Sequence, residues 1–234
     1  ALAINEVALG VDHPSTITSR GWMADLYENQ GFLDKASPLL KEVVSARERV
    51  QGRDHPDVAS ALNNRAALLM SQGKLSEAEP LFKRTQEIFE KSLGRDHPNV
   101  ATILNNRAQL LESQGKYEEA GPLYERSLAI REKVYGPDHP AVATALNNRA
   151  GLLNAQGKFA EAQPLFERAL AINEVALGVD HPSTITSRGW MADLYENQGF
   201  LDKASPLLKE VVSARERVQG RDHPDVASAL NNRA

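Results

Sequence analysis

The stretch Gly94-Arg95-Asp96-His97-Pro98 decides the fold, because its Asp-His-Pro core returns along the chain at a constant interval. Residues 43–84 match residues 85–126 at 24 of 42 positions, with no insertion or deletion. Such a period predicts one supersecondary unit, repeated and stacked as a solenoid. Every histidine of the chain lies in this tripeptide, 42 residues from the next: His13, His55, His97, His139, His181 and His223.

Each unit is predicted to contain two antiparallel helices. In the second unit, Pro56 suits the first turn of a helix, where a missing N–H costs nothing, and Asp54 or His55 is expected to cap it. This helix is expected to run to about Ser71, with Gly73 as its C-terminal cap. Its apolar stripe consists of Val58, Leu62, Ala66 and Leu69.

The second helix of the same unit is expected from near Leu75 to Leu93, where Gly94 ends it. Pro80 lies inside this segment, and we expect it to replace one of the first four N–H groups, which have no intrahelical partner. The expected buried side consists of Ala78, Leu81, Phe82, Ile88 and Phe89.

A single helix pair cannot cover its apolar faces, whereas stacking on the next pair covers them. We therefore predict an all-α fold, an alpha-alpha superhelix in the form of one solenoid over residues 1–234. Its units are expected at approximately residues 1–42, 43–84, 85–126, 127–168, 169–210 and 211–234, and both ends of the chain fall within helices.

Composition argues against several functional classes. The 31 acidic and 27 basic residues give a formal charge of −4, without the basic surplus that phosphate binding needs, so we expect no nucleic-acid partner. The chain has no cysteine, which excludes disulfides and thiolate zinc sites. No apolar stretch approaches the roughly 18 residues of a membrane span. We expect no membrane contact and, by default, a cytoplasmic location.

Catalytic and metal chemistry have no recognisable motif in the sequence. Histidines one repeat apart are expected to lie about 8 to 10 Å from each other, whereas zinc binds nitrogen at about 2.0 to 2.1 Å. The histidines are therefore expected to cap helices, with no metal and no cofactor. We find no nucleophile motif and no phosphate-binding glycine loop, so the chain is not expected to be an enzyme.

A set of segments makes up the pattern of the repeat: Gly94-Arg95-Asp96-His97-Pro98, Leu104-Asn105-Asn106, Ala108, the turn from Gln114 to Lys116, Tyr117, Ala120, Pro122-Leu123-Tyr124 and Ala129 to Val134. This pattern resembles the 42-residue tetratricopeptide repeats of kinesin light chain and its bacterial relatives. The resemblance covers the whole chain and implies a right-handed solenoid whose first helices line a concave groove for extended peptides of partner proteins.

The same resemblance places a pair of asparagines of each unit in the groove. An amide side chain donates and accepts hydrogen bonds, so it can bind an extended main chain of any sequence. The alternative is that these amides bind neighbouring repeats or water and only set the superhelix. The pairs are Asn63 and Asn64, Asn105 and Asn106, Asn147 and Asn148, and Asn231 and Asn232.

Two departures from the family pattern leave the specificity open. An arginine replaces the leucine that follows the asparagines, either pairing with carboxylates at the repeat boundary or forming a cationic ladder for acidic peptides. In two units Trp22 and Trp190 replace the second asparagine, either as aromatic anchors in the groove or as core packing. The arginines are Arg65, Arg107, Arg149 and Arg233.

Residues 1–66 are identical to residues 169–234. This offset of four units indicates either a recent duplication or an excerpt of a longer array. Neither end unit has a distinct capping sequence, which suggests head-to-tail association of molecules. The sequence therefore predicts a scaffold that binds proteins or peptides, with a self-associating structural array as the alternative.

Overall fold

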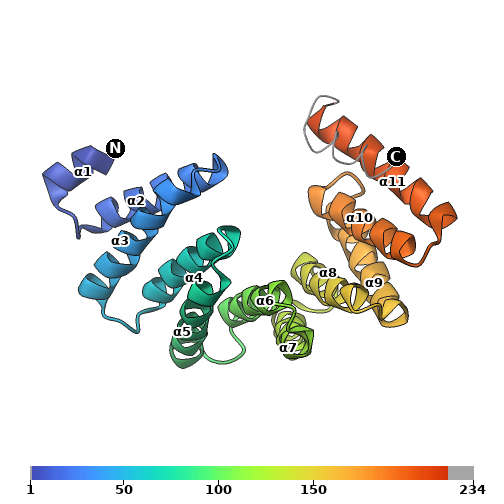
Figure 1. Ribbon diagram of the computed structural model, residues 1–234, viewed down its shortest axis with the longest axis horizontal. Coiled ribbons are helices and arrows are strands. Elements are labelled where there is room, and N and C mark those ends of the chain that lie inside the picture. The colour runs from blue at the N-terminus through green and yellow to red at the C-terminus, as the bar shows by residue number, and fades with distance from the viewer. Residues whose placement is uncertain (1, 221–234) are drawn as a thin grey trace. The chain divides into compact units, whose positions relative to one another are not determined.

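The computed structural model describes residues 2–220, in which eleven helices and no strand occur (Figure 1). The first helix of each pair begins at a proline: α2 (Pro14–Asn29), α4 (Pro56–Ser71), α6 (Pro98–Ser113), α8 (Pro140–Ala155) and α10 (Pro182–Asn197). The others are α1 (Leu2–Leu9), α3 (Leu33–Gln51), α5 (Leu75–Leu93), α7 (Tyr117–Tyr135), α9 (Phe159–Leu177) and α11 (Leu201–Gln219). The predicted all-α fold of helix pairs is confirmed.

Histidine, and not aspartate, caps the first helix of each pair. The Nδ1 atom of His55 accepts a hydrogen bond from the N–H of Asp57 at 3.1 Å. The same bond forms at His13, His97, His139 and His181. Each bond satisfies one of the backbone donors that a helix start leaves without a partner.

The aspartate before the histidine binds the second helix of the same pair instead. Asp54 accepts a hydrogen bond of 2.9 Å from Lys91, and this bond together with the lysine charge lowers the pKa of Asp54. Arg49 and Arg217 bind Asp12 and Asp180 in the same way. The aspartate thus ties the start of a pair's first helix to its second helix.

Glycine ends the helices where the chain turns back. Gly73 has a φ of 73°, which few other residues adopt, and the N–H of Lys74 bonds to the carbonyl of Leu69 at 2.8 Å. The expectation for Pro80 is wrong, because α5 begins at Leu75 and Pro80 is its sixth residue. The absent N–H therefore belongs to a position whose partner is an intrahelical carbonyl.

The described residues form two compact units that divide between Leu123 and Tyr124, inside α7. In the first unit α3 packs against both α2 and α4, and α5 packs against both α4 and α6. In the second, α9 packs against both α8 and α10, and α11 packs against α10. The division at 42-residue intervals within one solenoid stays a prediction.

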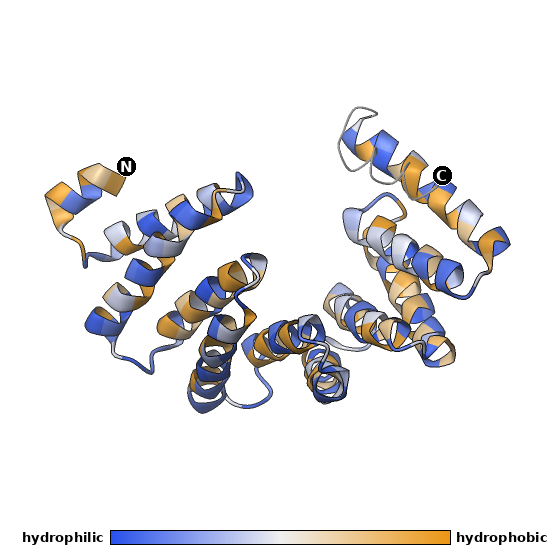
Figure 2. Cartoon of the chain, in the orientation of Figure 1, coloured by the Kyte–Doolittle hydropathy of each residue, from blue (hydrophilic) through white to orange (hydrophobic). Residues whose placement is uncertain are grey.

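The cores lie between successive helix pairs, because most helices carry apolar and polar residues on different sides (Figure 2). In the first unit a buried cluster joins α2, α3 and α4 through Ala24, Ala36, Leu40 and Leu68. In the second, Ala150, Ala162, Phe166, Met191 and Leu194 join α8, α9 and α10. Within residues 2–220, none of the helices combines the length and apolar character needed to cross a bilayer.

Candidate functional site

The two asparagines of each pair lie at different depths. Asn105 and Asn147 are buried, and Asn63 is half-buried. Of the second asparagines, Asn64 is exposed and Asn106 is half-buried. Asn148 is half-buried as well, while Asn231 and Asn232 lie outside the described residues. In each described pair the second asparagine is therefore the more exposed of the two.

Some of these amides bind polar side chains of a neighbouring first helix. Nδ2 of Asn106 donates to Oδ1 of Asn63 at 2.9 Å, which joins α6 to α4. Nδ2 of Asn147 donates to the hydroxyl of Ser187 at 2.8 Å, which joins α8 to α10. These bonds hold successive first helices together and fix the orientation of the amides.

A small pocket of about 190 Å³ lies beside this asparagine contact, between α4 and α6. Ser60, Asn64 and Thr102 form part of its polar rim. Phe89 and Ile103, both nearly fully buried, contribute its apolar floor. Exposed amides and hydroxyls over an apolar floor suit a short chain segment with one small apolar side chain.

The two tryptophans have the same local sequence but different surroundings. The ring of Trp190 is stacked on Phe166, with centroids 6.1 Å apart and planes 14° apart. It also covers Gly151 of α8, where a Cβ atom would lie 3.7 Å from the ring. Trp190 remains 37% exposed, whereas Trp22 is 70% exposed. Trp190 is thus both packed and partly exposed.

The arginines after the asparagines bind the second helix of the preceding pair. Arg149 lies 2.7 Å from the Glu125 carboxylate. Arg107 binds the side-chain oxygen of Gln86, and burial lowers its pKa. Arg65 is half-buried, and Arg233 lies outside the described residues. Carboxylate pairing thus holds for Arg149, whereas Arg107 uses an amide.

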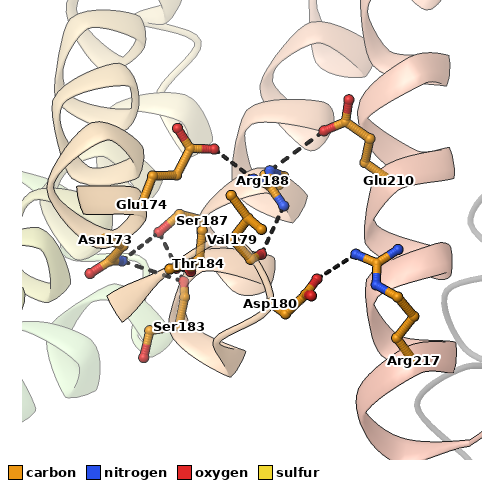
Figure 3. Close-up of polar contacts among 11 residues, drawn as sticks. Asn173, Glu174, Val179, Asp180, Ser183, Thr184, Ser187, Arg188, Glu210 and Arg217 are labelled. Atoms are coloured by element: carbon orange, nitrogen blue, oxygen red, sulfur yellow. Dashed lines mark hydrogen bonds and ion pairs between the residues drawn. The ribbon is translucent and has the colours of Figure 1, made fainter. Parts of the chain in front are cut away.

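Sequence reasoning missed a buried arginine in each tryptophan unit. Arg188 is 7% exposed; it lies 2.6 Å from Glu174 and 3.5 Å from Glu210, and donates to the carbonyl of Val179 at 3.0 Å (Figure 3). Arg20 has equivalent contacts with Glu6, Glu42 and Val11. Alignment of the repeats could have revealed it, because Arg188 stands at the position that a leucine has in the other units: Leu62, Leu104 and Leu146.

A metal centre has no support in the part of the chain that the structure describes, where no three His, Cys, Asp or Glu side chains gather as ligands. Each described histidine instead accepts a backbone hydrogen bond at a helix start. The paired carboxylates Asp193 and Glu196 have no hydrogen bond or ion pair with another described side chain.

Comparison with sequence families identifies the repeat. One tetratricopeptide repeat family matches residues 57–120, 100–174 and 142–189, and a second matches residues 16–57 and 184–225. A search of curated proteins finds no match.

Solved structures resemble the chain over most of its length. The nearly identical TPR-like repeats of a Podosopora anserina protein assigned as a kinesin light chain share 28% identity, with a TM-score of 0.72 over 88% of this chain and 98% of theirs. BtubC (BKLC) from P. vanneervenii has 22% identity and a TM-score of 0.74, covering 95% and 87%. PilW, a type IV pilus biogenesis factor, has 19% identity and a TM-score of 0.64, covering 94% and 88%. The last two show the fold alone.

Proposed function

Because the chain belongs to the tetratricopeptide repeat family, we propose that it is a scaffold that binds extended segments of partner proteins. The binding faces are those of α4 and α6 in one unit and of α8 and α10 in the other. No catalytic residue is part of this function. The proposal concerns the faces of the first helices, since these carry the accessible amides.

The observation that carries the proposal is the polar rim between α4 and α6. Asn64 is exposed and Asn106 is fixed by its bond to Asn63, so an amide of known orientation flanks the pocket. Such amides can donate to a peptide carbonyl and accept from a peptide N–H without reading a particular side chain. We therefore expect the ligand to be an extended segment that is bound with low affinity per contact and with broad sequence tolerance.

The test is a peptide-array screen against the immobilised chain, repeated with Asn64→Ala and Asn106→Ala combined. We expect the double variant to lose about 5-fold to 150-fold in affinity for the peptides that bind, because two hydrogen bonds are lost and each costs about 0.5 to 1.5 kcal/mol. Glu87→Ala, at an exposed position of α5, is the matched control and should keep the affinity. If the double variant binds the peptides with unchanged affinity, this face is not the binding site.

Self-association is the second candidate. It is supported by the identity of residues 1–66 with residues 169–234, because the side chains that α10 packs against α8 and α9 recur in α2. A copy of this chain could therefore contact α2 through the same kind of interface. Sedimentation velocity over a wide concentration range tests this, and a constant monomer mass at the highest concentration would eliminate it.

A further inference from the structure

The two tryptophan units differ from the others in the charge of their binding face. In each, a tryptophan is followed three residues later by an aspartate, as in Trp190 and Asp193, and both side chains share one helix face at this spacing. The other units have neutral pairs at these positions: Asn64 and Ala67, Asn106 and Gln109, and Asn148 and Gly151.

Trp190 is packed on one side and still partly exposed. Stacking on Phe166 and the absence of a side chain at Gly151 hold the indole in place, and 37% of the residue is exposed. An exposed indole face attracts a cation that lies within about 6 Å of its centroid. The chain already uses such contacts elsewhere, since the Lys35 ammonium lies 4.7 Å from the ring centroid of Phe32.

The aspartate beside the tryptophan has no cation of its own. Asp193 is half-buried and makes no hydrogen bond or ion pair with the described side chains, although burial and the nearby Glu196 raise its pKa. By contrast, Glu174 and Asp180 in the same unit are each paired with an arginine. An unpaired carboxylate in a partly desolvated place favours a cationic ligand.

In the first tryptophan repeat the following helix pair is described. Asp25, its copy of the aspartate, is exposed and has no ion pair with α4. Arg65 of α4 makes no ion pair with Asp25. The aspartate therefore lacks a basic partner from both its own helix and the next one described.

We propose that Trp190 with Asp193, and Trp22 with Asp25, form subsites for a lysine or arginine side chain of the bound segment. The inference rests on the proposed function and adds a specificity to it. The cationic head lies over the indole and pairs with the carboxylate, while the asparagines of the other units bind the main chain. An acidic side chain at this place would meet a like charge, so the subsite selects for basic segments.

The experiment uses the intrinsic fluorescence of the chain, because Trp22 and Trp190 are its two tryptophans. The probes are two nine-residue peptides of glycine and serine, with arginine at every third position in one and its neutral isostere citrulline in the other. We expect the arginine peptide to change the tryptophan emission and to bind at least about 5-fold more tightly at low salt, with the preference reduced at about 1 M salt, where screening acts over about 3 Å.

Variants separate the subsite from the general binding face. Asp25→Asn with Asp193→Asn should abolish the preference for arginine and leave the affinity for the citrulline peptide unchanged. Asn64→Ala with Asn106→Ala should weaken both peptides alike. Circular dichroism confirms that each variant remains folded.

Three results would overturn the inference. If both peptides bind equally and the asparagine variant weakens both, the scaffold function stands and the cationic subsite is wrong. If neither peptide binds or changes the emission, both proposals fail together. Persistence of the arginine preference in the aspartate double variant would also refute the subsite.

Discussion

Arg188 and Arg168 bring their guanidinium groups to equivalent partners, although Arg188 extends from α10 and Arg168 from α9. Arg168 lies 2.7 Å from Glu132 and donates to the carbonyl of Pro137 at 3.0 Å. Arg188 contacts Glu174 and the carbonyl of Val179, which stand 42 residues later. The same ionic contact therefore forms at both boundaries between successive helix pairs. The arginine that makes it belongs to the second helix of the following pair in one case and to the first helix in the other.

When the arginine moves from one helix to the other, the charge of the residue changes at both positions. At the position of Arg168 the tryptophan unit has Glu210, and at the position of Arg188 the other units have a leucine. Arg188 is thus balanced by two carboxylates and a carbonyl, which is what a buried guanidinium needs. Either set of residues supplies a cation for the glutamate and the carbonyl at this boundary. Repeats of both kinds can therefore follow one another in the chain.

Arg188→Leu is predicted to destabilise the protein, and Glu210→Arg is predicted to rescue it. The single change leaves Glu174 and Glu210 without their cation and should cost about 1–2 kcal/mol. This lies below the roughly 3–5 kcal/mol of a fully buried broken pair, because both carboxylates are more than a third exposed. Urea unfolding followed by circular dichroism measures the loss.

The double variant carries the residues of the asparagine units, Leu at 188 and Arg at 210, and should recover most of that stability. Glu210→Arg alone is the control and should destabilise, because it places a second cation beside Arg188. Additive losses in the double variant would show that the two arrangements are not interchangeable.

Ser187→Ala is predicted to cost about 1–3 kcal/mol, because two buried amides lose their acceptor. The Ser187 hydroxyl accepts from Nδ2 of Asn147 at 2.8 Å and from Nδ2 of Asn173 at 3.0 Å (Figure 3 shows the second). The matched variant is Ser19→Ala, where Asn5 alone donates to the hydroxyl, at 2.9 Å. Its loss, read from the same urea titration, should be about half as large, and equal losses would argue against a role for Asn147.

The helix pairs were predictable from sequence because their signals are local. Pro56 and Gly73 mark the start and the turn through backbone conformation alone, and α4 and α5 have the predicted bounds. The cap was ambiguous, since Asp and His both have side-chain acceptors. The cap position is left to His55 because Asp54 instead accepts a hydrogen bond from Lys91, 37 residues away. No local sequence pattern reveals this contact.

The site was less predictable because burial there depends on neighbouring pairs. The sequence Arg-Gly-Trp-Met-Ala is the same around Trp22 and Trp190, yet the exposures are 70% and 37%. The difference comes from Gly151 and Phe166 of the preceding pair. Likewise, the two side chains of an asparagine pair have the same chemistry, so the sequence does not distinguish them. The side chains packed around them decide which of the two amides is accessible.

This contrast predicts different costs for the same substitution. Trp190→Ala should destabilise the chain by about 1–2 kcal/mol, below the value for a fully buried aromatic, because part of the ring is exposed. Trp22→Ala should change stability by less than about 0.5 kcal/mol. Since both sites share one local sequence, helix propensity cancels in the comparison. Thermal and urea unfolding by circular dichroism provide the measurement, and equal losses would contradict the packing of Trp190.

Asp193 and Asp54 are predicted to affect stability with opposite pH dependence. Burial, followed by the charge of Glu196, raises the pKa of Asp193 above 3.8, so its ionised form is less favourable in the folded state. Its contribution therefore becomes unfavourable as the pH rises from 3.8 through the raised pKa. Asp193→Asn should raise the melting temperature at pH 7 and leave it unchanged near pH 3.

For Asp54 the sign is reversed. The hydrogen bond and charge of Lys91 lower its pKa, so the ionised form is favoured by folding and its stabilisation, present above pH 3.8, is lost as the pH falls through the lowered pKa. Asp54→Asn should therefore lower the melting temperature at pH 7 by a small amount, because the pair is exposed and screened by salt. Melting curves of both variants between pH 3 and 7 check the two signs. A fall in melting temperature at pH 7 on Asp193→Asn would mean that this aspartate already has a stabilising partner in the folded chain, which would also remove the basis for its role in binding a cation.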